Sequence, residues 1–554
     1  MFGDGRERNG VQMSALQVSC EGHRLQDSAS AEFVDIQSPF SNFDFVEKRF
    51  AKSQTIHRCF SLARSANCCC CVVEPLVDVG LLDDDTKEMR RLGYHVATTN
   101  FRLSFWKKPA SSKQEFNALA ESDLFGYMIV RCDGLDPADP QWYVFEAVLS
   151  KYDHPHNCVS MPGEYNLAVC GRNFRMRGVM FCQQNKLNKR CAQVSLRALL
   201  SRIVPGRDVA YSRINAIAAR VAKSIGETFN PSDGMSVMQI EQVLTDFGIR
   251  YKDVDYPRAA KSPKKLARLK KEIPYTKFMY AGAESGLGAL LGFKVHGGDE
   301  KSRHIIPIFG HTFNKDSWVS DARKFYFNDK DQYSAYMPSD SWTSSFIGHD
   351  DNLGPDFCVP RAYVLPEDVD YVVELYRSEV KYSGAIAEAI AFQVLKHLQN
   401  SLQVDEVWAP RLIDALDDGN VVLRSVSLPC ESYIVHLHQM RAWDGTEESR
   451  VAVDGFSQMK LPSVMWMVEV SLPQLFPANE AKIGEIVLDA TVLLKQTDFA
   501  ERKVSRKFLQ SIQFIRLPSA YYFPKSVSKS PEGKIINFFS APSAIKSHVG
   551  VIHL

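Results

Sequence analysis

The chain has 554 residues, 45% of them hydrophobic and 24% charged, which is enough for a folded protein of about two to four domains. A net charge of +1 excludes recruitment of nucleic acid or anionic membrane by overall charge. No apolar run approaches the ~18–20 residues of a membrane span, and the first residues lack the apolar core of a signal peptide. Thirteen cysteines, an odd number, favour a reducing compartment. We therefore expect a cytoplasmic protein that binds neither nucleic acid nor membrane.

The first 180 residues predict a tail followed by a domain of helices and strands. Residues 1–30 are polar, as in a loose tail. Residues 83–93 predict a helix, and residues 125–130 and 164–170 predict strands. Four adjacent cysteines, 68–71, precede two valines. Since neighbouring side chains on a strand point to opposite faces, this run predicts a buried strand rather than a metal site.

Cys191 is the candidate nucleophile of the central region, residues 181–365. Apolar residues recur after it at helical spacing, so a helix is expected to begin at or near Cys191. Unpaired backbone N–H groups and the positive end of the helix dipole at such a position favour thiolate over thiol.

The rest of the central region predicts alternating helices and strands. Helices are expected over 209–225 and 236–248, the second stopped by glycine. Strands are expected at 275–281, 288–295, 304–309 and 343–349. The basic stretch 258–277 predicts a solvated face rather than a nucleic-acid site, because no aromatic residues suited to base stacking interleave its charges.

A thiol nucleophile needs a base, a group that orients the base, and donors for the oxyanion. His304 opens an apolar strand and is the candidate base, with His311 as an alternative. The candidate orienting carboxylates are Asp350 or Asp351 after the next strand, with Asp321 as a rival. The candidate oxyanion donors are Gln184 or Gln183.

Residues 366–554 predict a C-terminal domain that begins with a helix over 367–399 and continues mostly as strands, including 465–470 and 484–489. Two pairs of histidines, 154 with 156 and 436 with 438, would each share one strand face. Neither pair brings an obvious third ligand. We therefore expect no metal and no cofactor.

This order of motifs resembles the papain-like cysteine peptidase superfamily. Within it, the chain is similar to the bacterial peptidase domains that cut leader peptides in peptide-exporting ABC transporters. The matching pieces, over about 180 of 554 residues, are Gln184, Cys191, the helix at 236–248, His304 and the turn from Asp350 to Gly354. Two positions depart from the pattern: Gln184 stands seven rather than six residues before the cysteine, and alanine rather than glycine follows it.

The resemblance implies an α+β fold with a papain-like core at 181–365, in which the helix bearing Cys191 packs on an antiparallel sheet bearing His304. An α+β domain at 31–180 and the helix and β-rich domain at 366–554 would flank this core. The implied activity is that of a bacterial thiol-dependent hydrolase, a cysteine peptidase acting on a peptide or protein substrate. A deamidase or transglutaminase with the same triad, and a binding or scaffold protein on a degenerate core, remain alternatives.

Overall fold

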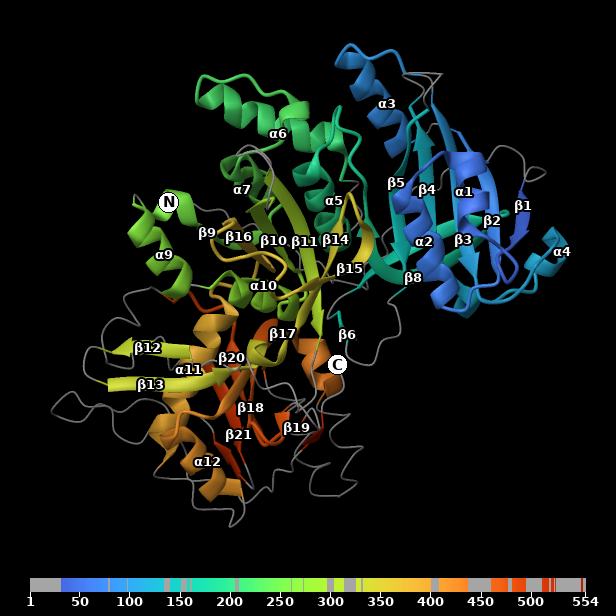
Figure 1. The fold of residues 1–554 in the computed structure, drawn as a ribbon. Helices are drawn as coiled ribbons and strands as arrows, with labels where there is room; N and C mark the ends of the chain where they lie inside the picture. The colour runs from blue at the N-terminus through green and yellow to red at the C-terminus, as the bar shows by residue number, and fades with distance from the viewer. Residues whose placement is uncertain are drawn as a thin grey trace, which may run out of the picture. The chain divides into compact units, whose positions relative to one another are not determined.

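The computed structural model describes residues 31–551 with gaps, the longest at 296–302, 313–324, 400–407, 437–459, 495–510 and 525–549. The described chain is an α+β protein built on largely antiparallel sheets, as predicted (Figure 1). It forms two compact units, the first from residues 1–152, 162–235 and 351–355 and the second from 153–161, 236–350 and 356–554. The predicted divisions at 180–181 and 365–366 fall inside these units, and the predicted tail lies outside the described residues. No described helix has the length and apolarity that a membrane crossing requires.

A seven-stranded antiparallel sheet forms the centre of the first unit. In spatial order its strands are β1 (Glu32–Asp35), β2 (Cys70–Leu76), β3 (Thr99–Trp106), β4 (Leu124–Cys132), β5 (Trp142–Leu149), β8 (Arg172–Phe181) and β7 (Gly163–Val169). Helices α1 (Asn42–Phe50) and α2 (Gln54–Ser65) pack on one face of this sheet. Helices α5 (Cys191–Ile203) and α6 (Tyr211–Ser224) contribute to the apolar core on the other face. Two further helices are α3 (Leu81–Arg91) and α4 (Lys113–Phe116).

The run of four cysteines is buried, as predicted. Strand β2 begins at Cys70, and its residues alternate between the two cores of the first unit. Cys71 packs in the core that contains α2, whereas Cys70 packs in the core that contains α5. The alternation of side chains along a strand thus places the thiols of Cys70 and Cys71 on opposite faces.

The second unit contains two larger sheets. The strands of the first, in spatial order, are β15 (Gly354–Pro360), β14 (Ser345–Asp350), β11 (Arg303–Thr312), β10 (Ala289–Lys294), β16 (Val369–Tyr376) and β9 (Arg250–Asp255), with β6 (Asn157–Cys158) also paired to β11. The helices in the same part of the chain are α7 (Val237–Asp246), α8 (Tyr256–Ala259), α9 (Pro263–Glu272) and α10 (Tyr275–Glu284).

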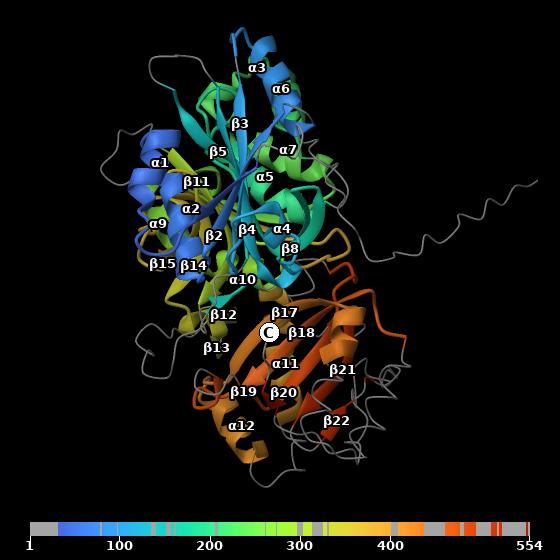
Figure 2. The same cartoon turned by 90° about the vertical axis from the view of Figure 1, so that its right-hand side faces the viewer.

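The other large sheet of the second unit comes mostly from the C-terminal part of the chain. Its strands, in order, are β12 (Phe325–Asp329), β13 (Gln332–Pro338), β17 (Val422–Pro429), β18 (Val464–Ser471), β20 (Gly484–Asp489), β21 (Ile512–Leu517) and β22 (Ala520–Tyr522). Helix α11 (Gly384–Leu398) packs on β17 and β18 (Figure 2), and α12 (Trp408–Asp417) follows it in the chain. A short pair, β19 (Ala481–Lys482) and β23 (Gly550–Val551), completes the unit.

Most predicted elements are confirmed, including the helices at α3, α6 and α7 and the strands at β4, β7, β10, β11, β14, β18 and β20. Three predictions are wrong. Residues 275–281 form helix α10 rather than a strand, because packing against β10, β11 and β16 outweighs the strand preference of their aromatic residues. Residues 369–376 form strand β16 rather than the start of a helix, because they pair with β10 on one side and β9 on the other. His436 lies in a helical segment rather than a strand, and His154, His156 and His438 lie outside the described residues.

Strand β16 buries a carboxyl group that makes stability depend on pH. Glu374 is 1% exposed, and among the described residues its Oε1 atom has no hydrogen-bond partner. Burial, reinforced by the nearby charge of Glu388, raises the pKa of Glu374 from 4.5 to about 8. The folded state therefore keeps a proton that the unfolded state loses between these two values, and this lowers the free energy of unfolding as pH rises through that window.

Glu374→Gln is expected to remove this dependence, because glutamine keeps the shape and cannot ionise. The variant should be close to the parent at pH 4.5 and gain stability relative to it up to pH 8, at no more than ~1.4 kcal/mol per pH unit. Urea unfolding across this range measures the difference. The exposed Glu379→Gln is the matched control. Parallel stability curves for the parent and Glu374→Gln would show that Glu374 is ionised in the folded protein.

Candidate active site

Cys191 is the first residue of α5, as predicted, after an extended Arg190 at the N-cap. Nine of the cysteines with a described environment are buried, and Cys191 is one of three that are not. Its position at a helix N-terminus supplies backbone N–H groups that have no partner within the helix. A partly exposed thiol in such a place is chemically accessible, unlike the buried thiols of β2.

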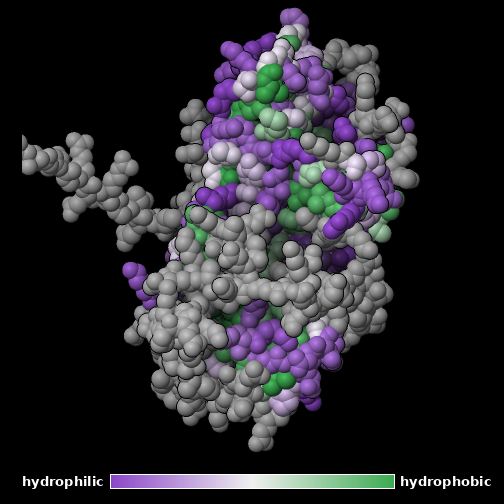
Figure 3. All heavy atoms as spheres, turned by 90° about the vertical axis from the view of Figure 1, so that its left-hand side faces the viewer, coloured by the Kyte–Doolittle hydropathy of each residue, from purple (hydrophilic) through white to green (hydrophobic). Residues whose placement is uncertain are grey.

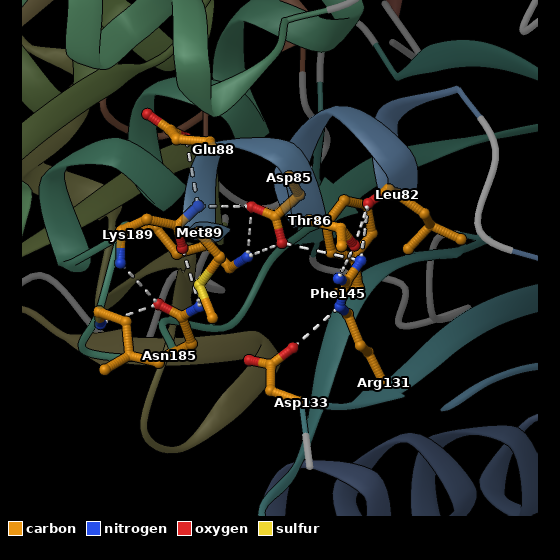
Figure 4. Close-up of polar contacts among 12 residues, drawn as sticks. Leu82, Asp85, Thr86, Glu88, Met89, Arg131, Asp133, Phe145, Asn185 and Lys189 are labelled. Carbon is orange, nitrogen blue, oxygen red and sulfur yellow. Dashed lines mark hydrogen bonds and ion pairs between the residues drawn. The ribbon is translucent and has the colours of Figure 1, made fainter. Parts of the chain in front are cut away.

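A buried polar network anchors the residues just before Cys191 (Figure 4). Lys189 is fully buried, and its Nζ lies 3.0 and 2.8 Å from the two carboxylate oxygens of Asp85 on α3. The ammonium also lies 4.7–5.1 Å from three aromatic ring centroids, those of Tyr143, Phe145 and Tyr211. Although burial alone would raise it, Lys189 and Arg131 lower the pKa of Asp85, so this carboxylate stays charged inside the first unit.

Amide side chains extend this network to the start of α5. Asn188 donates to Asp85 at 2.7 Å and to Glu88 at 3.2 Å. Asn215 on α6 donates to Glu88 at 2.9 Å and to the Asn188 carbonyl at 2.8 Å. The Gln193 side chain donates through Nε2 to Asn215 Oδ1 at 3.3 Å, and its Oε1 accepts the Arg190 backbone N–H at 3.2 Å. The first turn of α5 is therefore bound to α6, and through Asn215 to α3, by buried hydrogen bonds.

Sequence reasoning did not identify this network. Asp85 and Glu88 stand three residues apart and so share one face of α3. That spacing was the only available signal, and a solvated helix face produces the same pattern.

The two candidate glutamines have different environments. Gln183 exchanges hydrogen bonds with Val144 of β5: its N–H donates to the Val144 carbonyl at 2.9 Å and its Oε1 accepts the Val144 N–H at 3.0 Å. Gln184 instead donates through Nε2 to Asn352 Oδ1 at 3.3 Å. The Gln183 side chain is thus held against the backbone of β5, whereas the amide of Gln184 lies beside Asn352.

His304 and Asp350 are brought together by neighbouring strands of the second unit. The register pairs Ile308 of β11 with Gly348 of β14, so the start of β11 lies beside the end of β14. His304 Nε2 lies 3.2 Å from Asp350 Oδ2, and Asp350 is buried. The imidazole also meets the Phe293 ring edge-on, with centroids 5.6 Å apart. This arrangement can hold the ring in one orientation.

The candidate residues come from both units. Gln184 and Cys191 belong to the first unit, and His304 and Asp350 to the second. The chain passes from the second unit to the first between Asp350 and Asp351. Asp351 is buried, and Asp321 lies outside the described residues.

A separate pocket of about 270 Å³ lies beside β9, α8 and α9. Strand β9 is at the opposite edge of its sheet from β14 and β15, so this pocket is distinct from the His304–Asp350 pair. Its lining residue Arg258 is paired with Glu241 at 3.1 Å and Asp253 at 2.8 Å. Among the coloured residues of the face in Figure 3, hydrophilic side chains predominate, with small apolar areas between them.

Comparisons of the chain with protein-family models, with curated proteins and with solved structures found no match.

Proposed function

We propose that this protein is a thiol-dependent hydrolase of the papain-like kind, a cysteine peptidase acting on a peptide or protein substrate. Cys191 is the nucleophile, His304 the general base and Asp350 the residue that orients the base. The observation that carries the proposal is the His304–Asp350 pair at 3.2 Å. A partly exposed thiol at the first residue of a helix supports it.

In this mechanism the Cys191 sulfur attacks the substrate carbonyl after its proton passes to His304. Since Asp350 faces Nε2, the proton is taken up at Nδ1, and Asp350 stabilises the imidazolium that forms. His304 then returns the proton to the leaving amine, and water resolves the acyl-enzyme.

The oxyanion is stabilised by two N–H donors, the Cys191 backbone and Gln184 Nε2. Because this amide donates to Asn352, a bound oxyanion would compete with Asn352 for the donor.

Two alternatives to a peptidase remain, one a different enzyme with the same triad and the other a protein without catalytic activity. A deamidase or transglutaminase would form the same acyl-enzyme from a glutamine amide and differ only in what resolves it. A scaffold protein would keep the fold without an activated thiol, and thiol reactivity separates this reading from both enzyme classes.

The deciding experiment is alkylation of the full-length protein by iodoacetamide at pH 6, with each cysteine quantified by mass spectrometry. Cys358 on β15 is the internal reference because it is more exposed than Cys191 but does not begin a helix. We expect Cys191 to react at least about tenfold faster, because only an activated thiol is substantially ionised at this pH.

His304→Ala should slow labelling of Cys191 to the rate of Cys358, and Asp350→Asn should slow it partly. The exposed His397→Ala on α11 is the matched control and should leave it unchanged. Equal rates for the two cysteines, unaffected by His304→Ala, would favour the scaffold.

A further inference from the structure

A second cluster of thiol, imidazole and carboxylate lies entirely within the second unit. It consists of Cys158 on β6, His311 on β11 and Glu284 at the end of α10. The sulfur, a ring nitrogen and a carboxylate oxygen all lie within 4.8 Å of one another, and all three side chains are buried. The proposed function uses none of these residues; the sequence offered His311 only as an alternative base.

Strand pairing places the thiol against the imidazole. Strand β6 pairs antiparallel with β11, and Cys158 stands directly opposite His311, so their side chains share one face. Gly310 makes the close approach possible, because a Cβ atom there would lie 2.5 Å from the Cys158 carbonyl oxygen.

Helix α10 and strand β17 fix the orientation of the His311 ring. His311 Nε2 lies 2.7 Å from Glu284 Oε1, and the ring lies against Tyr280 with centroids 4.5 Å apart. Arg424 on β17 donates to both oxygens of Glu284, at 2.9 and 3.0 Å, and at 3.1 Å to Glu469. The His311 imidazole therefore has a defined position between the Cys158 thiol and the Glu284 carboxylate, and both oxygens of that carboxylate accept hydrogen bonds from Arg424.

Glu284 connects His311 to a set of buried ion pairs. Glu284 belongs to a connected buried network of three carboxylates and three cations: Glu284, Glu469 and Glu485, and Arg424, Lys482 and Arg516. His436 touches this network, but burial, together with the charge of Lys482, lowers its pKa and keeps it neutral.

His311 lies between this network and the Cys158 thiol. Burial opposes protonation of the imidazole, but Cys158 and Glu284 together raise the pKa of His311 to about 9. A Cys158 thiolate beside a protonated His311 would form a buried ion pair.

We propose that Cys158 is a second reactive thiol, held as a thiolate by His311, and that it reacts with hydrogen peroxide. Cys158 is 7% exposed, so its sulfur is closed to a peptide substrate, and a reagent for it must be small. The reagent that suits this site is therefore a small molecule with an electrophilic oxygen.

The reaction balances with the groups present. The thiolate attacks one peroxide oxygen, an S–O bond forms and the O–O bond breaks. The sulfur loses two electrons and becomes sulfenic acid, and the departing hydroxide takes the proton of His311 to leave as water. The ion pair is converted into two neutral groups.

The test exposes the full-length protein to hydrogen peroxide with dimedone present and measures trapped sulfenic acid at each cysteine by mass spectrometry. Cys68 is the internal reference, since it is comparably buried at 4% exposure and burial raises the pKa of its thiol to about 12. We expect trapping at Cys158 to be at least about tenfold faster than at Cys68. Cys191→Ala should leave it unchanged, which separates this proposal from the proposed function.

Two further measurements make the result decisive. In the parent protein the rate at Cys158 should be nearly constant from pH 6 to 8, whereas an un-ionised thiol would gain about tenfold per pH unit. His311→Gln, checked for folding by circular dichroism, should reduce the rate at least about tenfold. The proposal is overturned by a tenfold rise per pH unit or by equal rates at Cys158 and Cys68. It is also overturned by stoichiometric zinc that is lost in Cys158→Ser, which would identify a metal site instead.

Discussion

Cys191→Ala is expected to abolish hydrolysis, by a factor of about 10⁴ or more, while leaving the fold almost unaffected. A nucleophile has no substitute in covalent catalysis, so the whole acyl-enzyme route is lost. Because the thiol is partly exposed, its removal leaves no sealed cavity, and the free energy of unfolding should change by less than ~0.5 kcal/mol. Hydrolysis of a fluorescently labelled unfolded protein and thermal unfolding of the variant measure the two quantities.

Cys59→Ala is the matched control for this result. Cys59 is fully buried in the core beneath α2, so its truncation should lower stability by ~1 kcal/mol or more and leave activity intact at low temperature. A Cys191→Ala variant that keeps activity would refute Cys191 as the nucleophile. One that loses several degrees of melting temperature would show that the thiol has a packing role.

Lys189→Met should destabilise the first unit by ~3–5 kcal/mol. Methionine retains much of the side-chain volume and removes the ammonium, which leaves Asp85 buried without its closest cation. Urea unfolding followed by tryptophan fluorescence measures the loss. Because the same network holds the start of α5, alkylation of Cys191 at pH 6 should slow as well.

Two further variants test whether the loss of stability in Lys189→Met comes from leaving a buried charge unpaired. Lys87→Met removes an ammonium from the same helix as Asp85, where Lys87 pairs with Asp83 at the surface, and should change stability by less than ~0.5 kcal/mol. Adding Asp85→Asn to Lys189→Met should recover part of the stability, since it removes the unpaired charge. A loss below ~1 kcal/mol for Lys189→Met alone would show that water reaches Asp85.

Local patterns in the sequence were sufficient for much of the secondary structure. The apolar spacing after Cys191 placed the start of α5, and Ser236 with the glycine at 248 delimited α7. These signals work because capping, glycine conformation and side-chain periodicity act within a few residues of the chain. Where they were wrong, at α10 and β16, the deciding contacts came from strands and helices distant in sequence.

The candidate site divides in the same way. The order of Gln184, Cys191, His304 and Asp350 could be read from the chain, and so could the position of the last three at or near an element boundary. The 3.2 Å contact between His304 and Asp350 joins residues 46 positions apart, and only the pairing of β11 with β14 creates it.

The burial of Lys189 on Asp85, 104 positions away, and the pairing of Cys158 with His311 had no distinctive local pattern at all. The sequence by itself determined where α5 and α7 begin and how side chains alternate along β2, because those preferences are local. Only the tertiary structure decided which charged and nucleophilic side chains are enclosed together, because burial depends on what packs against them from elsewhere in the chain.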